Sequence, residues 1–172
     1  MQIALRTLGV LATMCCFGLS AAFAANGSWT YGTEDRGHPQ LVYSENGKTV
    51  FMVACGRAFG VHAVYPGVSK KDGDKATVTI ANSRAKTTLN GAIQNDVGAD
   101  DPPGTMHFVQ WDLGYARPDP ALYGTAWKMK MWRLFDLLDA GRPLTISAEG
   151  RSYKLPPIDI RGWERDFKSR CG

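Results

Sequence analysis

The sequence has little excess charge and few cysteines. Its 172 residues carry 20 Lys+Arg against 16 Asp+Glu, and this formal net charge of +4 is too mild to require nucleic acid or an anionic membrane as a partner. Hydrophobic residues make up 44% and charged residues 21%, an ordinary globular composition that argues against disorder, collagen-like repeats and coiled coils. There is also no internal repeat, low-complexity tract or domain linker.

Sequence motifs typical of catalysis or cofactor binding are missing as well. The chain has no CxxC pair, GxSxG elbow, Walker loop, Rossmann fingerprint or EF-hand. Its three histidines show neither HxH nor HExxH spacing, so a metal site would need all three to converge in space. We therefore expect no metal, no cofactor and no catalytic residue.

The first 24 residues have the pattern of a secretory signal. Arg6 supplies the positive charge, Thr7 to Phe23 is uncharged and largely apolar, and Ala22-Phe23-Ala24 is a small-x-small cleavage site. Cleavage after Ala24 leaves 148 residues, 25–172, a length that suits a single β-rich domain. No long apolar run follows, so we expect an exported protein without a membrane span, most simply periplasmic.

Two other interpretations of this segment stay open. An uncleaved membrane anchor would have an apolar run at the short end for a span. A lipoprotein signal would end at Cys15 or Cys16, but Ala12-Thr13-Met14 fits the usual residues before a lipidated cysteine poorly.

Cys55 and Cys171 are the cysteines that remain after cleavage. Two cysteines in an exported chain most often form one disulfide, and these two allow a single intramolecular pairing. The bond would tie the end of the chain to an early strand. A reactive thiol or metal thiolate is the alternative, but neither cysteine has a histidine at close ligand spacing.

Most of the mature sequence has strand character. Leu41 to Ser44 and Thr49 to Cys55 flank Asn46-Gly47, a dipeptide suited to the positive φ angles of a type I′ hairpin turn. Lys75 to Ala81 alternates, with Ala76, Val78 and Ile80 facing inward. Further strands are expected over Ala58–Tyr65, Arg84–Leu89 entering Asn90-Gly91, Thr105–Leu113, and a hairpin of Leu144–Glu149 with Ser152–Leu155 around Gly150-Arg151.

Two helices are expected among these strands. Ala126 to Met131 alternates with strand period and is interpreted as a short strand running into a helix over Met131 to Ala140, which Gly141 ends. Trp163 to Arg170 predicts a short amphipathic helix. The sequence thus predicts a mainly β protein, an antiparallel β-sandwich or partly open barrel, with a C-terminal helix held by the disulfide.

The C-terminal third resembles a known group of proteins. A helix ending in Ala140-Gly141, two strands containing Leu144-Thr145-Ile146-Ser147 and Tyr153-Lys154-Leu155-Pro156, and Trp163-x-x-x-Phe167-x-x-x-Cys171 follow an exported start. This tail is similar to that of small periplasmic β-sandwich proteins such as invasion-associated locus B protein and the periplasmic accessory proteins of type VI secretion. The resemblance implies a β-sandwich architecture and a periplasmic location, and it assigns no catalytic residue.

Three sets of residues are candidates for function. His62, His107 and Asp112 form a candidate polar set, in which His62 and His107 could share a sheet face and Asp112 follows Trp111 at a strand end. Trp127, Lys128 and Lys130 combine basic and aromatic side chains that suit an anionic or sugar ligand, although such side chains more often cap a core. The Asp-, Gly- and Pro-rich stretch Asn95 to Gly104 predicts an exposed loop.

These observations favour a non-enzymatic binding or accessory protein of the bacterial envelope, whose partner is an envelope protein or component. One alternative is an inhibitor or immunity protein that inserts Asn95 to Gly104 into a periplasmic toxin or lysozyme. Another is a small cell-wall hydrolase that uses His107 or Asp112.

Overall fold

The computed structural model describes residues 27–33, 37–55, 59–94, 107–110, 120–160 and 162–171. The proposed signal segment, the stretch Asn95 to Gly104 and Asp112 lie outside these residues. The elements run in the order β1(Gly27–Thr33), β2(Pro39–Glu45), β3(Lys48–Cys55), β4(Phe59–Val64), β5(Lys75–Ala81), β6(Lys86–Gln94), β7(His107–Gln110), α1(Pro120–Asp139), β8(Leu144–Ala148), β9(Arg151–Leu155) and α2(Trp163–Cys171).

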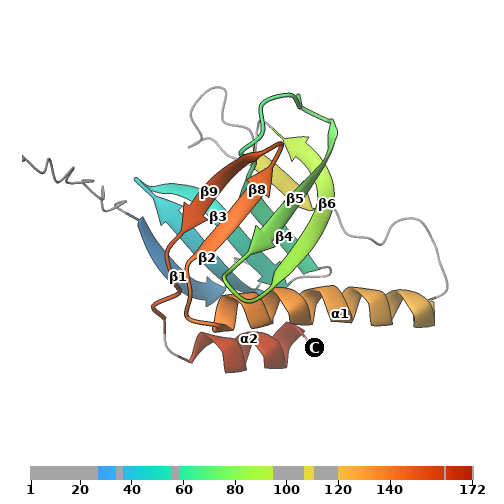
Figure 1. Ribbon diagram of the computed structural model, residues 1–172. Coiled ribbons are helices and arrows are strands. Elements are labelled where there is room, and N and C mark those ends of the chain that lie inside the picture. Colours follow the sequence, from blue (N-terminus) through green and yellow to red (C-terminus); the bar gives the residue numbers. More distant parts are fainter. Residues whose placement is uncertain are drawn as a thin grey trace, which may run out of the picture.

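The nine strands follow one another in a single antiparallel order, β1-β2-β3-β4-β7-β6-β5-β8-β9. The expected mainly β, antiparallel architecture is therefore confirmed. The sheet curls strongly, but β1 and β9, at the two ends of the order, are not paired with each other, so no closed barrel forms (Figure 1). Side chains bridge these edges instead, since the Trp29 indole of β1 donates to the Pro156 carbonyl just after β9, at 3.3 Å.

Both expected hairpins are present, and local backbone preference explains the first of their turns. Asn46 and Gly47 join β2 to β3 with φ angles of 52° and 77°, as a type I′ turn requires. The second turn lies one residue earlier than expected, because Glu149 and Gly150 take the positive φ angles, 50° and 73°. Ala148 therefore faces Arg151 across the hairpin.

One sheet face and the helices enclose the core. Along β5 the side chains of Ala76, Val78 and Ile80 are buried while their neighbours are more exposed, as the alternation predicted. Leu41 and Tyr43 of β2 are likewise fully buried. Strand after strand contributes alternate residues to this core, which fixes the register of the sheet.

The predicted end of the strand that begins near Arg84 was wrong. Asn90-Gly91 was expected to end this strand, but β6 continues to Gln94. Asn90 faces Thr77 of β5 in the register, and the two side chains are hydrogen-bonded at 2.9 Å. Pairing along the whole of β5 therefore outweighs the local turn preference of the dipeptide.

The expectation of a strand over Ala126 to Met131 was also wrong. These residues belong to α1, which begins at Pro120 rather than at Met131. Proline suits the first position of a helix because its missing N–H is not needed there. The residues that follow have helical spacing, and Leu134, Phe135 and Leu138 among them are buried. This helical pattern outweighs the alternation that suggested a strand. Gly141, with a φ of 58°, ends the helix region as expected.

The short C-terminal helix is confirmed as α2, and it covers β2 and β3 beside α1 (Figure 1). Phe167 is fully buried, and its ring centroid lies 5.1 Å from that of Phe135 in α1. Asp166 accepts a hydrogen bond from the Tyr31 hydroxyl of β1, and Lys168 forms an ion pair with Asp139 of α1. Among the described helices, none is both long enough and apolar enough to cross a membrane.

A carboxylate fastens the β8–β9 turn to the segment after β4. Glu149 accepts hydrogen bonds from the Tyr65 hydroxyl at 3.0 Å, from the Val68 and Ser69 amides at 2.9 Å each, and from the Ser69 hydroxyl. The bonds from Ser69 are the main reason that the pKa of Glu149 falls from 4.5 to about 2. The charged carboxylate is thus the form that holds the two segments together.

Glu149→Gln is expected to lower stability at neutral pH, because an amide NH2 would face groups that are themselves donors. A depressed pKa contributes stability above the unfolded value, near 4.5, and that contribution is lost as the pH falls toward 2. Urea unfolding of both proteins at several pH values measures this. The gap between wild type and variant should shrink steadily below about pH 5; a gap that stays constant down to pH 2 would contradict the prediction.

Candidate functional site

The structure places the sequence-derived candidates on different elements. His62 is buried in β4, opposite Val109 of β7, while His107 is opposite Val64. This register puts both histidine positions on the same sheet face, two residues apart along neighbouring strands. The third candidate of this set, Asp112, is outside the described residues, so the set stays a prediction. Within the described part of the chain, no three His, Cys, Asp or Glu residues gather as they would around a metal ion.

The other candidates lie on the helices and at the end of a strand. Trp127, Lys128 and Lys130 belong to α1, where Lys130 is half-buried and the side chains of the other two are outside the described residues. Cys55 is buried at the end of β3, and Cys171 is the last residue of α2. The Cys171 side chain is not among those described, so the pairing of the cysteines stays a prediction.

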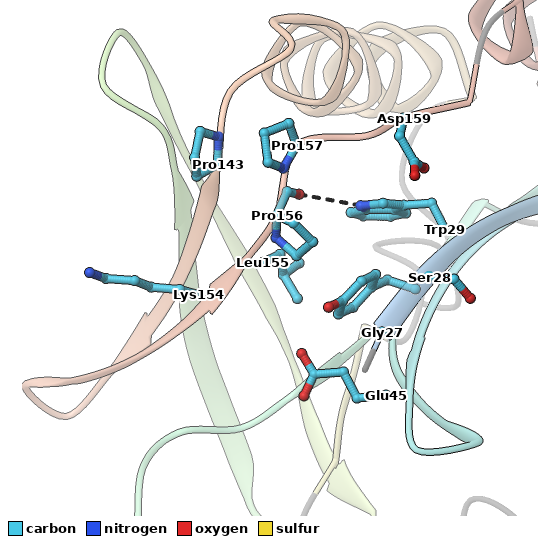
Figure 2. A pocket seen from close by; sticks show the side chains of 11 residues that line it. Gly27, Ser28, Trp29, Glu45, Pro143, Lys154, Leu155, Pro156, Pro157 and Asp159 are labelled. Carbon is cyan, nitrogen blue, oxygen red and sulfur yellow. Dashed lines mark hydrogen bonds between the residues drawn. The ribbon is translucent and has the colours of Figure 1, made fainter. Parts of the chain in front are cut away.

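Among the described residues, a concave site lies where the two ends of the sheet approach each other. We call it the seam pocket; its volume is about 450 Å³, within the range of small-molecule sites (Figure 2). The β1–β2 side and the segment around β9 form its opposite walls. Its lining residues are Gly27, Ser28, Trp29, Tyr43, Glu45, Pro143, Lys154, Leu155, Pro156, Pro157 and Asp159.

Aromatic packing and one glycine shape the β1–β2 wall. The Trp29 ring centroid lies 5.1 Å from that of Tyr43 and 6.0 Å from that of Phe51, so the indole is held against the core. A Cβ at Gly27 would lie 2.2 Å from the Tyr43 hydroxyl oxygen and 2.8 Å from Cγ of Glu45. Gly27 is therefore needed at this place because both side chains converge on its backbone.

The Tyr43 hydroxyl is an unusual feature of this wall. It is fully buried and has no hydrogen bond of good geometry within the described residues. Burial, and after it the adjacent Glu45 carboxylate, raises the pKa of Tyr43 to about 12, so the phenol stays protonated at neutral pH. Glu45 itself accepts a hydrogen bond from the Tyr153 hydroxyl of β9, and this bond links the two walls.

Tyr43→Phe is expected to leave the free energy of unfolding unchanged or raise it by about 1 kcal/mol, since it removes a buried hydroxyl whose contact with Glu45 lacks good hydrogen-bond geometry. Tyr153→Phe is the matched control. It deletes a hydroxyl that donates to a carboxylate, and it should lower stability by about 1.5 kcal/mol. Denaturant unfolding of the three proteins measures both effects. A loss in Tyr43→Phe as large as that in Tyr153→Phe would show that the Tyr43 hydroxyl has a partner.

Sequence reasoning did not select the residues of the seam pocket. Trp29 and Glu45 are more than a hundred positions away from Pro156 and Asp159, and only the curling of the sheet brings them together. Pro156-Pro157 was a visible signal, because it stops β9 and turns the chain across the edge. Nothing in the sequence indicated which strand that turn would meet.

The fold and the pocket define a class, namely a mainly β antiparallel protein with an aromatic-walled pocket between the two edge strands of its sheet. No protein-family model, no curated protein and no solved structure matches the chain significantly. The seam pocket is therefore interpreted from its own chemistry.

Proposed function

We propose that this chain is an exported, non-enzymatic binding or accessory protein of the bacterial envelope, and that it holds a small ligand in the seam pocket. The secretory pattern of residues 1–24 supports export. The observation that carries the binding role is the seam pocket itself, a cavity of about 450 Å³ whose wall holds the buried Tyr43 hydroxyl beside the Glu45 carboxylate. Pockets with apolar walls and a few placed polar groups are typical of ligand sites.

The groups that line the seam pocket suit binding better than catalysis. Its polar side chains are Ser28, Tyr43, Glu45, Lys154 and Asp159, and no histidine is among the described lining residues. Among the described lining residues Ser28 therefore has no imidazole base beside it, and a nucleophilic serine usually requires such a base. The inhibitor and hydrolase alternatives depend instead on Asn95 to Gly104 and on His107 or Asp112.

The proposal includes the disulfide between Cys55 and Cys171. Cys55 is buried at the end of β3, and α2, which ends at Cys171, packs against β2 and β3. A bond there would fasten the end of the chain over the sheet and prevent it from fraying.

The test is to purify the exported protein from its native host under mild conditions and to identify released small molecules by mass spectrometry. Asp159→Trp places bulk at an exposed position of the pocket lining, and Asp136→Trp makes the same change on α1, away from the pocket. A small molecule should accompany wild type and Asp136→Trp in stoichiometric amount and be lost from Asp159→Trp.

Other results would overturn the proposal. If no small molecule accompanies the wild type, or if Asp159→Trp retains it fully, the seam pocket is not the binding site. A stoichiometric enzyme partner would favour the inhibitor. N-terminal sequencing of the same sample should begin at Ala25, and a lipidated start at Cys15 or Cys16 would contradict the predicted processing.

A further inference from the structure

We infer that the seam pocket selects an organic cation, a ligand with an ammonium or guanidinium group on an apolar body. This inference rests on the proposed function and adds the chemical class of the ligand. Three features of the described residues carry it: the placement of charges, the aromatic wall, and the polar groups that converge at Gly27.

The charges that face the pocket are acidic. Glu45 and Asp159 lie on opposite sides of the pocket, and the one basic lining residue, Lys154, extends its ammonium away from the other lining residues (Figure 2). Two carboxylates with no cation directed between them repel an anionic ligand and attract a cationic one. This negative charge is a local feature of the pocket, since the chain as a whole carries a formal net charge of +4.

The walls suit the rest of such a ligand. Trp29, packed on the buried Tyr43 ring, supplies aromatic surface, and tryptophan has the face most favourable to a cation. Leu155 and the prolines at 143, 156 and 157 supply apolar surface on the opposite wall. A purely charged ligand such as a metal ion would leave this surface unused, whereas an amine with an apolar body covers it.

The polar groups near Gly27 favour a hydrogen-bond donor. The Tyr43 hydroxyl and the Glu45 side chain both approach the Gly27 backbone, within 2.2 Å and 2.8 Å of the position of a missing Cβ. The Tyr43 oxygen has no donor among the described residues, and carboxylate oxygens are acceptors only. The Tyr43 hydroxyl is itself fully buried, so the Glu45 carboxylate is the acceptor that a ligand can reach, and an ammonium or guanidinium group offers it several N–H donors.

The test uses three probes that share a phenyl ring: 2-phenylethylammonium, 2-phenylethanol and 3-phenylpropionate. Calorimetric titration of the purified protein should show the cation binding about tenfold more tightly than the alcohol, with no measurable binding of the carboxylate. Glu45→Gln and Asp159→Asn should each weaken binding of the cation about fivefold. The amide introduced by Glu45→Gln still offers an oxygen to the Tyr153 hydroxyl, so the link between the walls is kept in that variant.

Asp136→Asn makes the same charge change on an exposed position of α1 outside the pocket, and it should leave the affinity unchanged. The affinity of the wild type for the cation should also fall as the salt concentration rises from about 0.05 to 0.5 M, roughly as expected for exposed charges.

Nα-acetyl-lysine amide, a fourth probe, distinguishes a peptide side chain from a free amine as the source of the cation. Tighter binding of it than of 2-phenylethylammonium identifies a peptide side chain, and the reverse identifies a free amine.

Equal binding of the alcohol and the cation, or tighter binding of the carboxylate, would overturn the inference. So would equal affinity of all variants for the cation. If the native host supplies a neutral or anionic molecule that is lost from Asp159→Trp and kept by Asp159→Asn, the inference fails while the proposed function stands. Absence of any co-purifying molecule would instead refute the proposed function.

Discussion

Replacing Phe167 by alanine is expected to lower the free energy of unfolding by about 3–5 kcal/mol, the usual cost of deleting a buried phenylalanine. The ring is fully buried and lies against Phe135 of α1, Trp163 of α2 and Tyr31 of β1, with centroid distances of 5.1, 5.9 and 6.1 Å. The side chain therefore joins both helices to an edge strand. Denaturant unfolding followed by far-UV circular dichroism measures the loss.

Arg165→Ala is the matched control on the same helix. Arg165 is exposed, so its replacement should change stability by no more than about 0.5 kcal/mol. A loss below about 1 kcal/mol in Phe167→Ala would mean that α2 is not docked as described, since even partial relaxation around the cavity does not remove the lost burial.

Cys171→Ser is expected to lower stability by about 2–4 kcal/mol without changing the fold, if Cys171 is bonded to Cys55. The closed loop would span more than half of the 172 residues, and a bond across so long a loop restricts the unfolded chain strongly. Titration of thiols in the unreduced, denatured, exported protein should find none. Near-UV circular dichroism of the variant should match that of wild type.

The reduced wild type provides the control for this prediction. Reductant should lower its unfolding midpoint to about that of Cys171→Ser, and it should have no effect on Cys171→Ser itself. Two free thiols in unreduced protein from the periplasm would refute the pairing, and so would an equal response of both proteins to reductant.

The docking of α2 and the seam pocket involve two different groups of residues. Phe167 and Cys171 concern the docking of α2, which covers β2 and β3. Tyr43, Glu45 and Asp159 concern the seam pocket. A substitution of Phe167 or Cys171 that unfolds the chain would remove the pocket as well. The proposed substitutions of Glu45 and Asp159 should instead change ligand affinity in a folded protein.

The sequence alone determined the elements that depend on neighbours along the chain. Asn46-Gly47 accommodates positive φ at both turn positions without help from other segments, so the β2–β3 hairpin could be located. The alternation of β5 and the i, i+4 spacing of Trp163 and Phe167 likewise predicted which side chains are buried. In each case the deciding preference acts over a short stretch of neighbouring residues.

The tertiary structure decided what depends on distant partners. β6 passes through Asn90-Gly91 because β5 pairs with it there, and α1 extends back to Pro120 rather than beginning at Met131. The seam pocket depends on the longest separations of all, since Trp29 meets Pro156 only when nine twisted strands curl far enough for their edges to approach. Curvature summed over a whole sheet is a property of all its pairings together, and no single segment of the sequence encodes it.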